Sequence, residues 1–202
     1  MISYHPHIKR FLDIVLSFAA IVFFLPLFTV VYILIRLELE GSPFFIQERI
    51  GKGMTLFLLI KFRSMRIKTL SDNQFEPGQN NRITRIGKIL RKTKIDELPE
   101  LINILKGEMS IIGPRPEVDQ YVRIYPDDFR EILKVLPGLS DYASVKYRNE
   151  EEILACQSDP DEYYRKVILP DKLNLAKKYA ENISFQTDWH IIITTVKTLF
   201  RK

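Results

Sequence analysis

Two adjacent acids, Asp96 and Glu97, lie between a run of basic residues and a proline-flanked arginine. The basic residues upstream are Arg82, Arg85, Lys88, Arg91, Lys92 and Lys94. Paired carboxylates can supply a nucleophile, a general base or a metal ligand. In an arbitrary protein, two acids at a helix start more often act only as a cap that complements the helix dipole. The surrounding cations favour chemistry on a phosphate-bearing substrate here.

The arginine downstream of this pair lies in the stretch Gly113-Pro114-Arg115-Pro116. The two prolines restrict the backbone on either side of Arg115, so its guanidinium is presented from a stiff loop that has little entropy left to lose. Such a guanidinium is suited to bidentate binding of a phosphate. The stretch alone is a weak signal, because stiff surface turns are common.

Two consecutive helices are predicted to position the acidic pair. Apolar residues recur at helical spacing over residues 86–90, with basic residues on the other faces, which indicates a short amphipathic helix. A second helix is predicted to begin at Asp96 as its N-cap, to carry Pro99 in its first turn and to end at Gly107.

The remaining chain shows a hairpin and further helices. Gly41-Ser42-Pro43 marks a boundary, after which apolar runs at 44–46 and 56–60 flank Gly51-Lys52-Gly53 and indicate a β-hairpin. Residues 71–81 read as a polar loop. Helices are expected over 127–135, 149–157 and 160–181. The tail, residues 185–202, predicts an amphipathic helix that either packs on the core or lies in a membrane interface.

Residues 14–35 contain no formal charge, and this uncharged apolar run is long enough for a membrane segment. Lys9 and Arg10 precede it and Arg36 follows it, and no cleavage site indicates a removable signal peptide. Pro26 should kink or break the helix near its middle. Two readings stay open: a kinked spanning helix, which hydropathy slightly favours, and a re-entrant helix whose two ends share one membrane face.

Composition narrows the class of protein. The 202 residues carry a net charge of +5, which is compatible with nucleic acid, an anionic membrane or a phosphate-rich substrate. Nucleic acid is disfavoured because interleaved aromatic and basic residues are lacking. A single cysteine, Cys156, excludes a disulfide framework, and three histidines make histidine-rich metal chemistry improbable. A non-catalytic membrane-anchored scaffold is the alternative, but it does not explain the acidic pair between the basic helix and the arginine loop.

Three ordered segments, 85–91, 95–110 and 111–116, closely resemble the core signature of the bacterial sugar transferase family, the monotopic phosphoglycosyl transferases. The resemblance extends to Lys9-Arg10-Phe11-Leu12-Asp13, to 47–51 and to 61–65, and so covers nearly the whole chain. It departs from the family's frequent form at Leu25, where serine is usual before the proline. It also departs at Pro137-Gly-Leu-Ser-Asp-Tyr-Ala-Ser-Val145, where Pro-Gly-Ile-Thr-Gly-Trp-Ala-Gln-Val is frequent. The second departure leaves the donor sugar open.

The resemblance implies a mostly helical α+β fold, with a re-entrant membrane helix at 1–40 and a catalytic domain at 41–202 on the cytoplasmic face of the bacterial inner membrane. It implies that Asp96 attacks the β-phosphorus of a UDP-sugar, releases UMP, and passes the phosphosugar to polyprenyl phosphate in the first membrane step of glycoconjugate synthesis. Glu97 would bind Mg²⁺.

Further cations are expected to serve the same reaction. Arg115 is the first candidate for a diphosphate clamp, with Lys61, Arg91 and Arg148 as further members of the same electropositive surface. Asp171 and Lys172 are a further possible pair, although a solvated helix start is the simpler interpretation. The sequence leaves the glycan pathway and the oligomeric state, including a homodimer, open.

Overall fold

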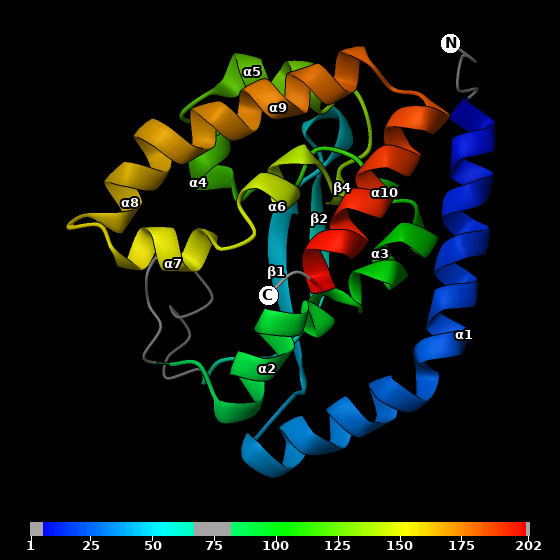
Figure 1. Ribbon diagram of the computed structural model, residues 1–202, viewed down its shortest axis with the longest axis vertical. Helices are drawn as coiled ribbons and strands as arrows, with labels where there is room; N and C mark the ends of the chain where they lie inside the picture. The colour runs from blue at the N-terminus through cyan, green and yellow to red at the C-terminus, as the bar shows by residue number, and fades with distance from the viewer. Residues whose placement is uncertain (1–5, 67–81, 201–202) are drawn as a thin grey trace.

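The computed structural model describes residues 6–66 and 82–200, so the predicted polar loop at 71–81 lies outside the described residues. The described part is mostly helical with two small sheets, as the fold-class prediction requires (Figure 1). The helices are α1 (Pro6–Glu38), α2 (Arg85–Thr93), α3 (Glu100–Lys106), α4 (Asp119–Val122), α5 (Pro126–Ile132), α6 (Tyr142–Lys146), α7 (Glu150–Ala155), α8 (Pro160–Tyr163), α9 (Leu169–Glu181) and α10 (Phe185–Phe200).

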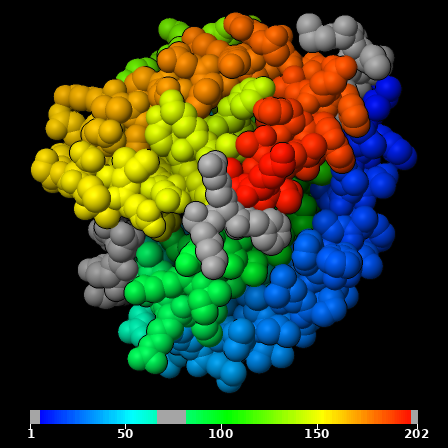
Figure 2. All heavy atoms as spheres, viewed as in Figure 1, coloured from blue at the N-terminus to red at the C-terminus, as the bar shows by residue number. Residues whose placement is uncertain are grey.

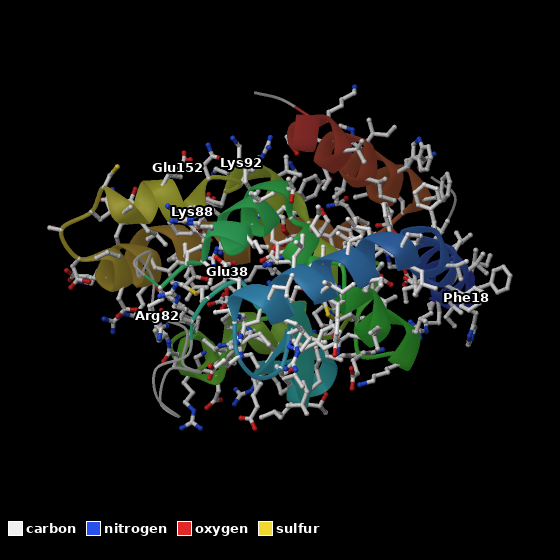
Figure 3. The ribbon with its side chains drawn as sticks, turned by 90° about the horizontal axis from the view of Figure 1, so that it is seen from below. Phe18, Glu38, Arg82, Lys88, Lys92 and Glu152 are labelled. Atoms are coloured by element: carbon white, nitrogen blue, oxygen red, sulfur yellow. The ribbon has the colours of Figure 1, made fainter. Side chains whose placement is uncertain are left out.

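The N-terminal helix α1 is continuous through Pro26, and it bends midway so that it follows two sides of the molecule (Figure 1). The predicted kink is confirmed, whereas a complete break of the helix is not found. This helix alone, among the described residues, is long and apolar enough to cross a membrane. Its outer side is unpacked: Phe23 is 76% exposed and Leu37 is 80% exposed. Phe18 points away from the rest of the molecule (Figure 3).

The predicted hairpin is confirmed. Strands β1 (Phe44–Ile50) and β2 (Leu56–Phe62) pair in antiparallel register, with Ile46 opposite Ile60 and Ile50 opposite Leu56. Successive side chains of a strand point to opposite faces, so the two faces of β2 have different surroundings. Phe57 and Leu59 pack against α3, whereas Leu56 and Leu58 are exposed.

The second sheet was not predicted. It is a two-stranded parallel sheet of β3 (Ser110–Ile112) and β4 (Gly138–Ser140). Strands of three residues carry too little periodic signal to be recognised in a sequence. Their position matters, because β3 leads directly into the loop that carries Arg115.

The C-terminal half forms a helical layer over one end of the hairpin (Figure 1). The predicted helix at 160–181 is one helical run in three parts, because a π-helical turn, η4 (Tyr164–Ile168), joins α8 to α9. The predicted helices at 127–135 and 149–157 are found as α5 and α7 with shorter bounds. Buried side chains from α4, α5, η4 and α9 form the largest hydrophobic cluster, which includes Tyr121, Phe129, Ile168 and Leu173.

The tail helix α10 lies beside the first arm of α1 (Figure 1). It packs Ile191 into the protein but leaves Phe185, Trp189 and Val196 exposed. The two expectations for this helix are therefore compatible, since one face packs on the core and another is apolar and open. In the space-filling view α1 forms one continuous margin of the molecule, with α10 next to it (Figure 2).

Candidate active site

The acidic pair sits on a tight turn between two helices. Helix α2 ends at Thr93, its C-cap Lys94 adopts the left-handed conformation (φ 58°), and residues Ile95–Glu97 form a single 3₁₀ turn, η3. The prediction that Asp96 caps the following helix is wrong, because α3 begins at Glu100 after Pro99. A proline that lacks an N–H fits this start of α3. Asp96 is thus left with its carboxylate unused by helix capping.

Strand β2 brings a lysine to this turn. Lys61 Nζ lies 3.1 Å from Glu97 Oε1 and 3.2 Å from Glu100 Oε1. Asn103 of α3 fixes the strand against the helix: its Oδ1 accepts from Ile60 N (3.1 Å) and its Nδ2 donates to Leu58 O (2.7 Å). Because these contacts fix the part of the strand that directly precedes Lys61, they help to position the lysine.

A third element supplies the arginine. Arg115 donates from Nη2 to Glu97 Oε1 (2.5 Å) and from Nη1 to Glu97 Oε2 (3.3 Å), which is a bidentate pair. The loop can approach β4 only because residue 113 is glycine: a Cβ there would lie 2.4 Å from Leu136 O. The predicted stiffness of the loop therefore has a second source, which is close backbone packing.

The two carboxylates of the pair have opposite electrostatic environments. Burial raises the pKa of Asp96, and the neighbouring charge of Glu97 raises it further, although Lys61, Lys94 and Arg91 partly offset this. Burial would also raise the pKa of Glu97, but Arg115 and Lys61 hold it well below its usual range. Adjacent acids whose pKa values are driven apart are a common feature of active sites.

Asp96 is the member of the pair that keeps an unused oxygen. The residue is only 8% exposed, and its Oδ1 is buried without a hydrogen-bond partner among the described residues. Both oxygens of Glu97, by contrast, are occupied by cations. Buried polar atoms are normally paired, so an unpaired one indicates a place for an ion or a reacting group.

The donor set fits Mg²⁺ in part. Within 6–66 and 82–200, no cluster of three or more acids, histidines or cysteines could enclose a metal ion. Mg²⁺ commonly uses one or two carboxylates together with substrate phosphates, so the orphaned Asp96 Oδ1 suits it. The predicted ligand Glu97 would first have to give up a contact with Arg115 or Lys61.

The structure brings four of the predicted site residues together: Asp96, Glu97, Lys61 and Arg115. Arg91 lies near enough for its charge to lower the pKa of Asp96, but its ion pair is with Glu151. Arg148 is half-buried and lies between α6 and α7, and its role stays a prediction.

The pair Asp171 and Lys172 lies in the helical layer. Lys172 Nζ contacts Glu150 Oε2 (2.6 Å), whereas Asp171 accepts from Lys146 and Tyr147 (both 2.7 Å). Lys172 and Arg115 line one small pocket, together with two buried acids, Glu117 and Asp141, and with apolar side chains of α5, α6 and α9. Lys172 is therefore adjacent to the candidate site, and Asp171 serves the packing of α6 on α9.

Sequence reasoning missed two acids of the site. Glu100 is 1% exposed and shares Lys61 with Glu97; burial raises its pKa. Its spacing of three and four residues from the acidic pair was an available signal. Asp141 accepts from the backbone N of Arg115 (3.2 Å), a contact between residues distant in sequence that no local pattern reveals.

The N-terminal motif fastens α1 to the site elements. Arg10 donates to Ile104 O (2.7 Å) and Leu105 O (3.1 Å) at the end of α3, and Asp13 accepts from Ser110 Oγ (2.8 Å) and Ile111 N (3.0 Å) in β3. These contacts satisfy carbonyls and an amide that α3 and β3 would otherwise leave open. The motif therefore joins α1 to the two elements on which the acids and Arg115 depend.

The other end of α1 is fastened to the same domain. Glu38, labelled in Figure 3, accepts from Arg85 N (2.8 Å) and Ile86 N (3.1 Å) and so caps the start of α2. Val31 and Ile35 of this arm pack with Phe62 and Leu90. Both ends of the apolar helix are thus attached to the elements that carry the candidate site.

The sequence that forms this site matches a known family. Residues 4–202 match the family described as "bacterial sugar transferase". The chain belongs to the bacterial sugar transferase family. The resemblance seen in its motifs is therefore confirmed at the level of the family.

Individual members of the bacterial sugar transferase family are also similar. A UDP-N-acetylgalactosamine-undecaprenyl-phosphate N-acetylgalactosaminephosphotransferase of Aeromonas hydrophila is 38% identical over 95% of this chain and 43% of its own length. A putative undecaprenyl-phosphate N-acetylgalactosaminyl 1-phosphate transferase of Bacillus subtilis is 49% identical over 54% of this chain and 62% of its own length. A UDP-glucose:undecaprenyl-phosphate glucose-1-phosphate transferase of Caulobacter vibrioides is 36% identical over 68% of this chain and 53% of its own length. The chain thus spans less than two thirds of these relatives.

Proposed function

We propose that this protein is a phosphoglycosyl transferase that moves a sugar 1-phosphate from a UDP-sugar to a polyprenyl phosphate such as undecaprenyl phosphate. The observation that carries the proposal is that the two carboxylates of the acidic pair have different partners. Glu97 is bound to Arg115 and Lys61, whereas the carboxylate of Asp96 keeps an unpaired oxygen within the same cationic cluster. The names of the relatives support the same reaction class.

In the first step, an oxygen of Asp96 attacks the β-phosphorus of the donor. A new bond forms between that oxygen and phosphorus, the bond from the β-phosphorus to the bridging oxygen breaks, and UMP leaves with that oxygen. The phosphosugar stays on Asp96 as an acyl phosphate.

In the second step, a phosphate oxygen of the polyprenyl phosphate attacks the same phosphorus. The acyl phosphate bond breaks, the carboxylate of Asp96 is regenerated, and the product is a polyprenyl diphosphate sugar. Arg115 and Lys61 reduce the repulsion between the anionic reactants in both steps. Two successive displacements at one residue predict ping-pong kinetics.

The side chains around the acids divide the remaining work. Arg115 and Lys61 orient the diphosphate, and Lys94 and Arg91 favour the ionised form of Asp96 by lowering its pKa. Asp96, with Glu97 after it has exchanged a partner, would hold Mg²⁺, which neutralises charge on the diphosphate and on the leaving phosphate when bound.

We further propose that α1 is re-entrant and that the domain lies on the cytoplasmic face of the bacterial inner membrane. Lys9, Arg10 and Asp13 at one end and Glu38 at the other all bind the same domain. A domain of this kind cannot lie on both sides of a bilayer. The exposed apolar side of the bent helix supplies the surface that lipid would cover.

A non-catalytic scaffold remains the alternative function, and one experiment separates the two. The purified protein with Mg²⁺ and undecaprenyl phosphate is given a panel of UDP-sugars, and UMP release is measured. Wild type should release UMP with at least one donor, and Asp96→Asn should lower the rate by about three orders of magnitude or more. Unchanged turnover in Asp96→Asn, or no radiolabelled phosphosugar trapped on residue 96 without acceptor, would refute the assignment of the nucleophile.

A further inference from the structure

Asp141 is a buried carboxylate that touches the Arg115 loop. It lies between β4 and α6 and is 3% exposed. Its two oxygens have different partners: Oδ1 accepts from Ser144 N and Ser144 Oγ, both at 2.6 Å, and Oδ2 accepts from Arg115 N at 3.2 Å. One oxygen therefore caps α6, and the other holds the main chain of the arginine.

The residues just before Arg115 are held by main-chain contacts to β4. Gly113 N donates to Ser140 O (3.1 Å), and Pro114 O accepts from Gly138 N (2.9 Å). The guanidinium itself makes a 3.4 Å contact with Leu139 O beside its bond to Glu97. Asp141 Oδ2 is thus the side-chain acceptor that binds the main chain of Arg115 itself.

Capping alone does not account for both oxygens. An N-cap needs one acceptor, as Asp159 shows at the start of α8, where its Oδ1 accepts from Glu162 N at 2.9 Å. Asp141 also lines the pocket shared by Arg115 and Lys172.

We infer that Asp141 is a positioning residue for the transfer: by holding Arg115 N, it fixes the guanidinium where the donor's diphosphate binds. The inference rests on the proposed function. Asp141 contacts no reacting atom and acts through Arg115. A residue with this role should change donor affinity rather than the chemical step, because Arg115 contacts the diphosphate before and during the reaction.

The variant Asp141→Asn separates the two tasks of the side chain. Asparagine has one acceptor oxygen and is a good N-cap, so it can keep the bonds to Ser144. Its amide nitrogen cannot accept from Arg115 N. We expect KM for the donor to rise about fivefold, the effect of one lost hydrogen bond, with kcat within about twofold. The donor is the fastest of UDP-N-acetylgalactosamine, UDP-glucose and UDP-galactose.

Two comparisons exclude a general structural effect. Asp159→Asn changes an exposed cap far from the site and should leave KM unchanged. In an Arg115→Ala background, Asp141→Asn should cause no further rise in KM, because residues that act through one another are non-additive. If Asp141→Asn folds poorly, Asp141→Ser keeps a capping hydroxyl and serves as the second variant.

Binding of UDP, measured by calorimetry, makes the same comparison without turnover. A weaker UDP affinity in Asp141→Asn supports the inference even if no donor is turned over, in which case the proposed function alone fails. Equal UDP affinities and equal KM values in wild type and Asp141→Asn overturn the inference and leave the proposed function intact. Additive effects of Asp141→Asn and Arg115→Ala overturn it as well.

Discussion

Asp96 and Glu97 differ by one position in the chain, yet they occupy different electrostatic environments. Lys61 and Arg115 come from β2 and from the loop after β3, and both turn to Glu97. Asp96 remains buried and lacks an ion-pair partner among those described. An unpaired buried carboxylate destabilises a fold, and proteins retain such groups where function requires them.

Asp96→Asn should therefore stabilise the protein at neutral pH by about 1 kcal/mol and raise its melting temperature by about 2–4 °C. The folded-state pKa of Asp96 is raised, so its contribution to stability is intact below the ordinary value of 3.8 and is lost as the pH rises through the raised pKa. The difference between variant and wild type should shrink toward that acidic limit. Thermal denaturation in detergent at several pH values checks this, with exposed Asp127→Asn as the control.

Lys61 should set the acidic limb of the pH–rate profile. In the proposed reaction Asp96 attacks as a carboxylate, so kcat/KM should rise with pH through its raised pKa. The charge of Lys61 lowers that pKa, and its removal in Lys61→Met should move the limb to higher pH. Lys52→Met, at the exposed turn of the same hairpin, is the matched control. An unshifted limb in Lys61→Met would show that another group controls the profile.

At the scale of elements, local patterns predicted the hairpin, α2, the helical end at Gly107 and most of the later helices. They did not predict β3, β4 or the turn that carries the acids. Asp96 was assigned as a cap because an aspartate before a helix is usually one. The proline at position 99 and the left-handed Lys94 instead create a separate 3₁₀ turn. The 3₁₀ turn forms because this segment packs against β2, and local sequence patterns carry no information about that packing.

Strand β3 depends on α1, and this dependence can be measured. Asp13 is 4% exposed and accepts from Ser110 Oγ and Ile111 N. Asp13→Ala would leave these donors buried without a partner, at a cost of about 2–3 kcal/mol. The melting temperature should fall by about 5–10 °C. Asp119→Ala removes an exposed ion pair with Arg123 and should change it by less than about 2 °C. Equal effects of the two variants would contradict the structure.

At the scale of the whole molecule, hydropathy identified the membrane segment but could not choose its topology. The contacts that support the proposed re-entrant topology join residues far apart in sequence: Arg10 with Ile104 and Glu38 with Arg85. They cannot be inferred from the helix itself. The predicted boundary between 1–40 and 41–202 stays a prediction, although side chains from both sides of it share hydrophobic clusters.

Cysteine labelling tests the topology directly. Cys156 is exposed and marks the side of the helical layer. In a Cys156→Ser background, single cysteines at exposed Ile8 and Glu40 should react with an impermeant reagent from the same side as Cys156 does in wild type. Labelling of positions 8 and 40 from opposite sides of the membrane would contradict a re-entrant helix. Inverted vesicles and whole cells supply the two orientations.

The attachment of α1 at both ends also limits how the protein can be engineered. A version cut near residue 41 to make it water-soluble would lose the guanidinium that closes α3 and the carboxylates that complete β3 and α2. It would also uncover Phe62 and Leu90. Helix α1 is therefore part of the folded domain. Making this protein water-soluble requires a redesigned outer surface on the helix rather than its removal.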